Sequence, residues 1–272
     1  MAVAVVTGGA SGFGLALASS CAERGMAVAL LDLDGARAAS EAAGLGEGHG
    51  VRALGLGVDV GDGAAVQAAA EAVEERLGGA DLVVSNVGVQ LFGSIDRLTD
   101  DEWRWVMDVN VVGSARVVRA FLPQLRRSPQ PRLAFTTSSS VLDPAARMAA
   151  YQASKFAVWG LAETLRVELA GEGIGVTVVF PSGMITRHLE TSEAAQPAHL
   201  QRPIGEADDL EAMLASNPGL AAAVALPEDA AGPVLEAVLA GEPYVITHGD
   251  LVEAVDGRAD ALRAAAERAR QP

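Results

Sequence analysis

Short apolar runs alternate with helical stretches along this chain, and this alternation limits the possible fold more than any other feature. Runs such as Ala2–Val6 and Gly175–Phe180 contain no charged residue, which is typical of strands buried on both faces. Because helical segments separate the strands, we expect right-handed βαβ units and an α/β fold with a parallel sheet covered by helices on both faces. The predicted strands are Ala2–Val6, Met26–Leu31, Val51–Val58, Asp81–Val84, Leu133–Thr137, Gly175–Phe180 and Tyr244–His248. The predicted helices run from the first turn to about Gly25, then over Gly63–Leu77, Asp108–Arg127, Tyr151 to about Ala170, Pro227–Ala240 and Asp250–Arg270.

The first strand leads directly into the glycine-rich segment Thr7–Gly14. Its glycines, Gly8, Gly12 and Gly14, have the spacing Gly-x-x-x-Gly-x-Gly. Between a strand and a helix, such glycines permit a tight turn and let backbone N–H groups approach a pyrophosphate. The segment therefore predicts a dinucleotide site. The alternative is an ordinary glycine-rich turn between a strand and a helix.

The second strand ends at Asp32. A carboxylate at this position can bind both hydroxyls of an adenosine ribose and would repel a 2′-phosphate, which favours NAD over NADP. Arg37 lies close in sequence and leaves the use of NADP open. The alternative is that Asp32 or Asp34 only caps the next helix.

Polar or small residues also follow the third to sixth predicted strands. They are Asp59-Val60, Ser85-Asn86-Val87-Gly88, Ser138-Ser139-Ser140 and Pro181–Thr186. Ligands of parallel α/β sheets bind beyond the carboxyl ends of the strands. Because all of these segments lie at such ends, we expect them to share one site.

Tyr151 and Lys155 stand four residues apart on a predicted helix, so their side chains share one face. Lys155 is the only lysine in the chain. A phenol with a pKa of about 10 is a poor acid or base at neutral pH, and a neighbouring ammonium stabilises the phenolate and lowers that pKa. The pair therefore indicates a general acid/base. The alternative is a surface pair on an alanine-rich helix.

These motifs, taken in order, resemble those of the short-chain dehydrogenase/reductase family over about residues 2–250. The residues that carry the resemblance are Thr7–Gly14, Asn86-Val87-Gly88, Asn110, Ser138, Tyr151 and Lys155. The resemblance implies a single-domain Rossmann-type fold, a doubly wound seven-stranded parallel sheet, and nicotinamide chemistry.

The resemblance also implies catalytic roles. Tyr151 would exchange a proton with the substrate oxygen, and Lys155 would lower the pKa of Tyr151 and hold the nicotinamide ribose. Ser138 would hydrogen-bond the substrate oxygen, with Ser139 as its main competitor, unless the serine run only satisfies backbone groups at the strand end. Asn110 would anchor a water relay to the lysine, unless it only pairs with helix backbone.

Further contacts follow from the same resemblance. The expected cofactor contacts are Gly8, Ser11, Gly12, Phe13, Gly14, Asp32, Leu33, Asp59, Val60, Asn86, Val87, Gly88, Tyr151, Lys155, Pro181, Gly183, Met184 and Thr186. The expected substrate contacts are Ser138, Tyr151, Gln90, Leu142 and Met148, with Val141, Met184 and Ile185–Leu200 as further candidates. This lining is mainly apolar and indicates a medium-sized apolar or aromatic secondary alcohol. We expect His188 and His199 to be solvated loop residues.

Four positions depart from the family pattern, and at the first of them Ser85 replaces an asparagine. Val87 replaces an alanine and is large enough to crowd the adenosine side. Val141 replaces a glycine, which puts the shape of the substrate pocket in question. Ser182 replaces a glycine after the sixth strand, but Thr186 still follows Pro181 by five residues, so the contacts to the carboxamide side of the cofactor are expected to survive.

Composition limits the partners and the compartment. The net charge of −15 argues against nucleic acid and anionic membranes as partners. The single cysteine, Cys21, permits no disulfide within the chain and fits a reducing cytoplasm. No basic leader precedes the first strand, and no run of roughly 20 apolar residues is present, so neither a signal peptide nor a membrane span is expected. No cluster of His, Cys and carboxylates indicates a metal site.

We expect one domain over residues 1–272. Residues 1–186 would form the cofactor and catalytic core, and residues 228–272 a helix, a strand and a helix at the C-terminal end. Between them, residues 187–227 show no clear strand, carry three prolines and an acidic stretch, and are interpreted as a substrate lid.

The sequence thus predicts an NAD(H)-dependent oxidoreductase that interconverts a secondary alcohol and a ketone. The alternatives are a non-redox enzyme on the same fold, such as an epimerase, dehydratase or lyase with bound NAD, and a non-catalytic NAD-binding sensor. By family resemblance, helices near 108–127 and 151–170 would form a homodimer interface that pairs again into a homotetramer. Trp103, Trp105 and Trp159 are candidate interface anchors.

Overall fold

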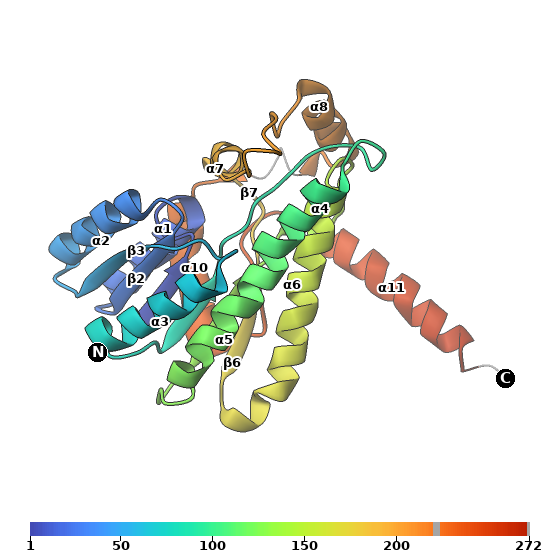
Figure 1. Cartoon of the computed structure of the whole chain (residues 1–272). Coiled ribbons are helices and arrows are strands. Elements are labelled where there is room, and N and C mark those ends of the chain that lie inside the picture. Colours follow the sequence, from blue (N-terminus) through green and yellow to red (C-terminus); the bar gives the residue numbers. More distant parts are fainter. Residues whose placement is uncertain (220–223, 271–272) are drawn as a thin grey trace.

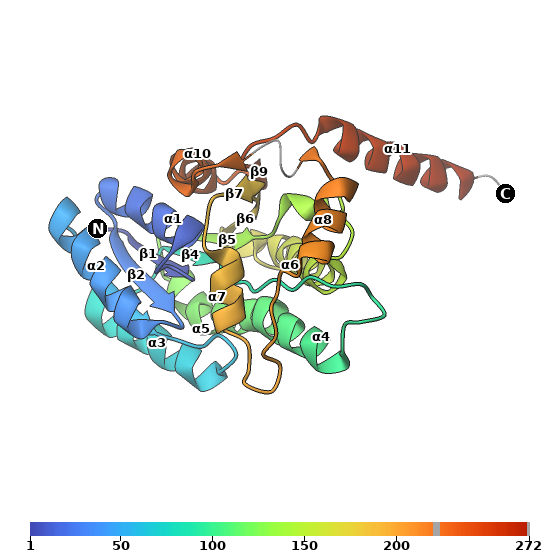
Figure 2. The same cartoon turned by 90° about the horizontal axis from the view of Figure 1, so that it is seen from above.

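The computed structural model describes residues 1–219 and 224–270. Its centre is a seven-stranded sheet in which every pair of neighbouring strands is parallel (Figures 1 and 2). In sheet order the strands are β3 (Ala53–Gly57), β2 (Ala27–Asp32), β1 (Val3–Thr7), β4 (Leu82–Ser85), β5 (Arg132–Thr136), β6 (Gly175–Phe180) and β9 (Tyr244–Ile246). The predicted parallel α/β sheet is therefore confirmed. The direction of winding reverses between β1 and β4, where such sheets form a crevice for ligands.

Side chains of the central strand enter two separate cores. Val3 and Val5 of β1 lie in one cluster, and Ala4 and Val6 lie in the other. This alternation follows from the two-residue period of a strand. Because both clusters are apolar, β1 carries no polar face, which explains its continuous apolar sequence.

Helices cover both faces of the sheet (Figure 2). One layer holds α1 (Gly12–Glu23), α2 (Gly35–His49) and α10 (Pro227–Ala240); the other holds α3 (Gly63–Leu77), α5 (Gly113–Leu125) and α6 (Ala149–Glu168). Helix α2 is absent from the sequence-based list of helices. Its sequence contains four glycines, which disfavour a helix by about 1 kcal/mol each. Close packing outweighs this cost: a Cβ added to Gly55 of β3 would lie 2.1 Å from the carbonyl oxygen of Ala38.

The long helix predicted over 108–127 has a more complex form. Helix α4 (Asp100–Met107) begins at a capping box in which Thr99 and Glu102 bond reciprocally. A π-helical turn, Asp108–Val112, then joins α4 to α5. Such turns are rare and occur frequently at functional sites. This one contains the predicted site residue Asn110.

In its described residues, the predicted lid includes helices α7 (His188–Ala194) and α8 (Ala207–Ser216) and the short strand β8 (Val224–Ala225). The expectation of no strand is wrong, because β8 pairs in parallel with β7 (Gly183–Met184). Two-residue strands carry no sequence period, so the pattern could not reveal them. Residues 220–223 of the predicted lid lie outside the described residues.

The C-terminal helix α11 (Val252–Arg268) leaves the body of the molecule (Figures 1 and 2). Two 3-10 turns, Ser139–Val141 and Ala170–Glu172, complete the elements that bear on the site. Within the described residues, no helix is long and apolar enough to cross a membrane.

Cys21 lies in α1 at the centre of a core cluster, with no exposed surface. Burial raises the pKa of its thiol to about 12, although Arg24 acts in the opposite direction. Cys21 therefore acts as a small apolar residue of the core.

Candidate active site

A cavity of about 910 Å³ lies at the carboxyl ends of the strands. Each expected cofactor contact lines it: Gly8, Ser11, Gly12, Phe13, Gly14, Asp32, Leu33, Asp59, Val60, Asn86, Val87, Gly88, Tyr151, Lys155, Pro181, Gly183, Met184 and Thr186. These residues come from the segments after β1, β2, β3, β4 and β6 and from α6. The sheet therefore brings together segments that are up to about 180 residues apart in sequence.

The glycine turn has the geometry that a bound pyrophosphate requires. Gly8 and Gly12 have φ angles of +63° and +52°, a region that residues with a side chain rarely adopt. A Cβ added to Gly14 would lie 2.1 Å from the carbonyl oxygen of Gly8, so only glycine fits there. The N-terminus of α1 begins at Gly12 and opens toward the cavity. The turn thus fits the phosphates of a dinucleotide.

Asp32 holds the glycine turn against the end of β2. Its Oδ2 accepts a hydrogen bond from the backbone N–H of Ala10 at 3.0 Å, and its Oδ1 accepts one from that of Asp34 at 3.2 Å. Asp34, not Asp32, caps α2 by accepting from the backbone N–H of Arg37. The guanidinium of Arg37 lies 3.6 Å from the carboxylate of Glu41. Asp32 is therefore the carboxylate that lines the cavity at the end of β2.

The turn after β4 is tied to the end of β1. The hydroxyl of Thr7 accepts hydrogen bonds from the backbone N–H groups of Asn86 (2.9 Å) and Val87 (3.1 Å). The Asn86 side chain returns a bond to the carbonyl of Thr7 at 3.0 Å. Val87 is accommodated, since it packs against the core while still lining the cavity.

Tyr151, Ser138 and Lys155 meet in one wall of the cavity. Tyr151 and Lys155 lie on α6, and Ser138 follows β5. The Ser138 side chain lies close enough to Tyr151 to lower the pKa of its phenol. Lys155 Nζ lies 5.7 Å from the centre of the Tyr151 ring and donates to the carbonyl of Thr136 at 3.0 Å. The three side chains are therefore placed to act on one small group.

Burial shifts the pKa values of Tyr151 and Lys155 in this wall. It raises the pKa of Tyr151 to about 12, against a smaller lowering by the hydrogen bond with Ser138. It lowers the pKa of Lys155 to about 8. The direction for Tyr151 is opposite to the one expected from an adjacent ammonium, because loss of water around the buried phenol is the largest influence on its pKa.

Ser139 and Ser140 differ from Ser138 in what their side chains do. Ser138 accepts hydrogen bonds from the N–H and from the hydroxyl of Ser140, at 3.2 and 2.9 Å. Ser139 is 2% exposed and uses its backbone N–H to bond the carbonyl of Pro181. Ser138 is the serine whose side chain meets Tyr151.

Asn110 lies behind the cavity wall and not in it. Its side chain bonds both backbone groups of Val89, with Oδ1 accepting at 2.8 Å and Nδ2 donating at 2.9 Å. The same Nδ2 donates to the hydroxyl of Ser154 on α6 at 2.8 Å. The π-helical turn thus fastens the segment after β4 to the helix that carries Tyr151 and Lys155.

The substrate side of the cavity differs from the sequence-based expectation. Gln90 and Met148 line it as expected. Leu142 and Val141 lie outside the lining and pack in the core below, because the 3-10 turn directs them away from the cavity. The large residue at position 141 therefore fills the core instead of narrowing the pocket.

His188 is placed in the wall, not in solvent. Its ring centre lies 6.4 Å from that of Tyr151, and it is half-buried. Burial, together with the charge of Lys155, lowers the pKa of His188 to about 4, so its imidazole is neutral at pH 7. A helix that starts at His188 turns the ring inward, and no local pattern in the sequence indicated that start.

Further apolar wall residues were not singled out from the sequence: Phe92, Trp105, Leu210, Met213 and Leu214. Trp105, expected as an interface anchor, belongs to this wall. Leu210, Met213 and Leu214 share one face of α8. Their helical spacing was the feature of the sequence that could have identified them.

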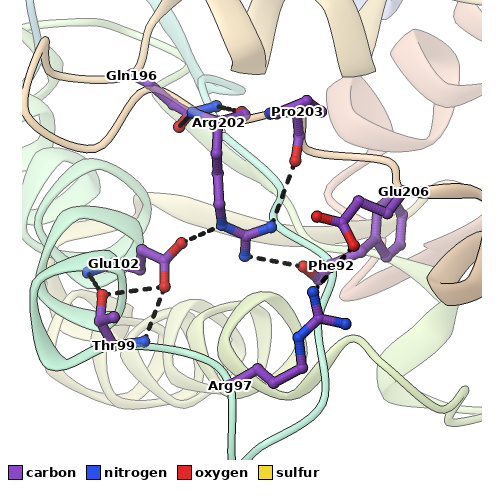
Figure 3. A network of polar contacts seen from close by, with 8 residues as sticks. All are labelled: Phe92, Arg97, Thr99, Glu102, Gln196, Arg202, Pro203 and Glu206. Carbon is purple, nitrogen blue, oxygen red and sulfur yellow. Dashed lines mark hydrogen bonds and ion pairs between the residues drawn. The ribbon is translucent and has the colours of Figure 1, made fainter.

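Arg202, in the segment predicted to be a lid, fastens that segment to α4 and to the residues after β4 (Figure 3). Its guanidinium donates to the carboxylate of Glu102 and to the carbonyl of Phe92, the latter at 3.2 Å. Burial raises the pKa of Glu102, but hydrogen bonds from Arg202 and Thr99 outweigh it and hold that pKa below its usual value. The side-chain amide of Gln196 donates to the carbonyl of Arg202 at 2.8 Å.

Two further ion pairs hold the same part of the lid. Arg97 lies 2.9 Å from Glu206, and Arg147 lies 3.5 Å from the buried Asp209. Helix α8 is thereby fixed over the apolar wall. Helix α7 meets the segment after β4 through a hydrogen bond from the backbone N–H of Gln90 to Ser192.

Comparisons with known proteins agree with this geometry. The family model for short chain dehydrogenases matches residues 2–197. D-threitol dehydrogenase of Mycolicibacterium smegmatis is 33% identical over 184 residues, covering 68% of this chain and 70% of that protein. A short chain dehydrogenase/reductase from Burkholderia phymatum, solved with NAD, has a TM-score of 0.86 and 30% identity, covering 97% of this chain and 94% of that chain. L-sorbose reductase from Gluconobacter frateurii, solved with NADPH and L-sorbose, has a TM-score of 0.77 and 26% identity, covering 92% and 96%.

The Rossmann-type sheet, the glycine turn and these similarities define an oxidoreductase that uses NAD(P). The relatives and neighbours include enzymes with NAD and with NADPH. The chain belongs to the short chain dehydrogenase family.

Proposed function

We propose that this protein interconverts a secondary alcohol and a ketone with NAD(H), and that Tyr151 is its general acid/base. The observation that carries the proposal is the meeting of Tyr151, Ser138 and Lys155 in one wall of the cavity that the glycine turn closes at the other end. A carbinol needs a proton acceptor and a hydrogen-bond donor at the same oxygen, and Tyr151 and Ser138 supply both.

Each side chain of the wall has its own task. In oxidation, Tyr151 Oη accepts the proton of the alcohol, and in reduction it returns a proton to the carbonyl oxygen. Ser138 holds that oxygen in place, and the ammonium of Lys155 favours the phenolate as the proton moves. When bound, NAD(P) supplies the hydride acceptor or donor. The glycine turn, Asp32, Asn86 and Lys155 are the groups that would hold it.

Asp32 is the basis for preferring NAD over NADP. Its carboxylate lines the cavity at the end of β2, where it can accept from ribose hydroxyls and would repel a 2′-phosphate. Arg37, the nearest basic candidate, is paired with Glu41.

The substrate class follows from the far end of the cavity. Apolar side chains from four segments line it: Phe92, Trp105, Met148, Leu210, Met213 and Leu214. His188 is neutral at this end, and the guanidinium of Arg187, which also lines the cavity, is paired with Glu190 at 2.6 Å. A medium-sized apolar or aromatic secondary alcohol therefore fits better than an anionic one.

The first experiment is a fluorescence titration of the purified protein with NADH and with NADPH. We expect tight binding of NADH and weak binding of NADPH, followed by turnover of apolar secondary alcohols with NAD. Cofactor that co-purifies and never turns over would favour an epimerase, dehydratase or lyase. Failure to bind either dinucleotide would favour a role outside catalysis.

The Asp32→Ala variant tests the cofactor preference. We expect the ratio of NADH to NADPH affinity to narrow by about tenfold or more, because the variant removes an acceptor for the ribose and a repulsive charge. The Asp34→Ala variant is the matched control, since it removes the cap of α2 outside the cavity. An unchanged ratio in Asp32→Ala would assign the preference to another residue.

The proposal includes a homo-oligomer that works in the cytoplasm. Phe156 and Val167 expose apolar surface on α6, in keeping with a homodimer or homotetramer through α5 and α6. The single unpaired cysteine suits work in the cytoplasm.

A further inference from the structure

Helix α11 extends from the body of the molecule without a core of its own. Its bounds are Val252–Arg268, and none of its residues is buried (Figures 1 and 2). Val252 and Leu262 are 67% and 66% exposed, and Val255 is 38% exposed. A helix of this length that contains Gly257 is marginal in water, because most helical stability in proteins comes from packing of an apolar face. The apolar face of α11 therefore needs a partner.

The exposed apolar residues of α11 form a heptad stripe. Val252, Val255, Ala259, Leu262 and Ala266 follow one another at spacings of three, four, three and four residues. This is the a/d pattern of a two-helix coiled coil. Each member of the stripe is exposed.

The side of α11 that faces its own subunit is a different one. Arg258 is half-buried there, donates to the carbonyl of Val141, and lies 5.4 Å from the ring centre of Phe156. These contacts fix the start of the helix on α6 and leave the stripe free. The partner of the stripe must therefore come from another molecule.

The charges beside the stripe identify that molecule as a second copy of the chain. Asp256 and Arg263 both occupy e positions of the heptad, and Arg258 occupies a g position. In an antiparallel pair, e positions face e positions, so Asp256 meets Arg263 of the partner subunit, and the contact occurs twice by symmetry. In a parallel pair, Arg258 would instead face Arg263 of the partner subunit, which is repulsive.

We propose that α11 is an intersubunit arm that pairs antiparallel with α11 of a second copy. The central contact is Ala259 against Leu262 of the partner subunit, with two Asp256–Arg263 ion pairs beside it. Arg263 lies 2.8 Å from Asp260 on its own helix, where both side chains are exposed, so it remains available to a second carboxylate. This surface is separate from the faces of α5 and α6 and does not depend on the proposed reaction.

Two charge reversals test the pairing through amide hydrogen exchange of residues 255–266 in the full chain. Asp256→Arg alone places like charges in both contacts, and so does Arg263→Asp alone. We expect either variant to speed exchange of these amides by roughly tenfold or more relative to the natural chain. An equimolar mixture of the two variants restores opposite charges in both contacts, so slow exchange should return.

The controls separate pairing from changes in the helix itself. Arg268→Asp makes the same charge change at a c position outside the stripe and should leave exchange slow. Leu262→Glu removes the central contact and should give fast exchange that no mixture rescues, with turnover retained because Leu262 lies outside the cavity lining. Fast exchange in the natural chain, or a mixture without recovery, would overturn the antiparallel pair.

Discussion

Lys155 is a buried ammonium with one backbone acceptor, and this has a cost for stability. The side chain is 3% exposed, and burial lowers its pKa from 10.5 to about 8. Below pH 8 the lysine is charged in both the folded and the unfolded chain, so the folded state carries the full penalty. As pH rises from about 8 to 10.5, the unfolded chain holds the proton more strongly, and the penalty disappears.

The Lys155→Met variant should therefore be more stable and inactive. At pH 7 we expect a gain in unfolding free energy of at most roughly 3 kcal/mol, reduced by the lost bond to Thr136. Denaturant unfolding at pH 7 and at pH 10.5 measures the gain, which should shrink at the higher pH. A variant less stable than the natural chain at pH 7 would contradict this account.

The Tyr151→Phe variant removes only the hydroxyl that exchanges the proton. We expect NADH affinity to stay within a few-fold and turnover to fall by about 10² or more. The chain has one other tyrosine, Tyr244, whose hydroxyl bonds Glu163 far from the cavity, so Tyr244→Phe is the matched control. Turnover that survives in Tyr151→Phe would remove the proposed role.

Single residues were predictable where local spacing decides their position. The interval between Tyr151 and Lys155 is one helical turn, and the glycines of the first turn follow a strand directly, so both could be placed from the sequence. Leu142 and His188 could not, because their directions depend on a 3-10 turn and on the start of a lid helix. Such features arise from tertiary contacts that leave no period in the sequence.

At the scale of elements, buried strands were the most predictable part. Each of the seven is a short apolar run between turn residues, and the structure moves their ends by only one or two residues. The glycine-rich helix α2 and the π-helical turn at Asp108–Val112 were not predictable. The first depends on close packing against β3, and the second is followed by Gly113, where a Cβ would lie 2.8 Å from the side chain of Val60.

The lid depends on the ion pair between Arg202 and Glu102. The Arg202→Met variant leaves a carboxylate that is 5% exposed without its cation, which typically costs about 3–5 kcal/mol. Because the pair joins the lid to α4, we expect the loss to loosen α8. KM for the alcohol should rise by about tenfold or more, while NADH affinity stays unchanged.

The control for this prediction is Arg104→Met on α4. Arg104 is exposed and pairs with Asp100 and Asp101, so surface screening makes its loss nearly neutral. The Glu102→Gln variant adds a second check, since it removes the charge but keeps the acceptor. If KM is the same in Arg202→Met as in the natural chain, the lid does not need this pair.

At the scale of the whole molecule, the site depends on the order of strands. The sheet order places β1 between β2 and β4, so the glycine turn, Asp32 and Asn86 converge although Gly8 and Asn86 are 78 residues apart. Two separate apolar clusters, one on each face of the sheet, hold these strands in place. The cavity therefore exists only in the assembled sheet, and a dinucleotide that fills it should stabilise the whole fold.

The rate at which a reagent modifies the buried thiol of Cys21 should report how often the protein opens. The thiol is inaccessible and its pKa is about 12, so a thiol reagent modifies it only in molecules whose α1 has left the sheet. With NADH at about 100 times its Kd, we expect modification to slow by about 100-fold if opening is global. The Cys21→Ala variant, which has no thiol, gives the background signal of the reagent. If NADH does not change the rate of modification, α1 opens without the rest of the fold. Because no second thiol competes, a cysteine introduced anywhere on the surface would take a label at a single known position.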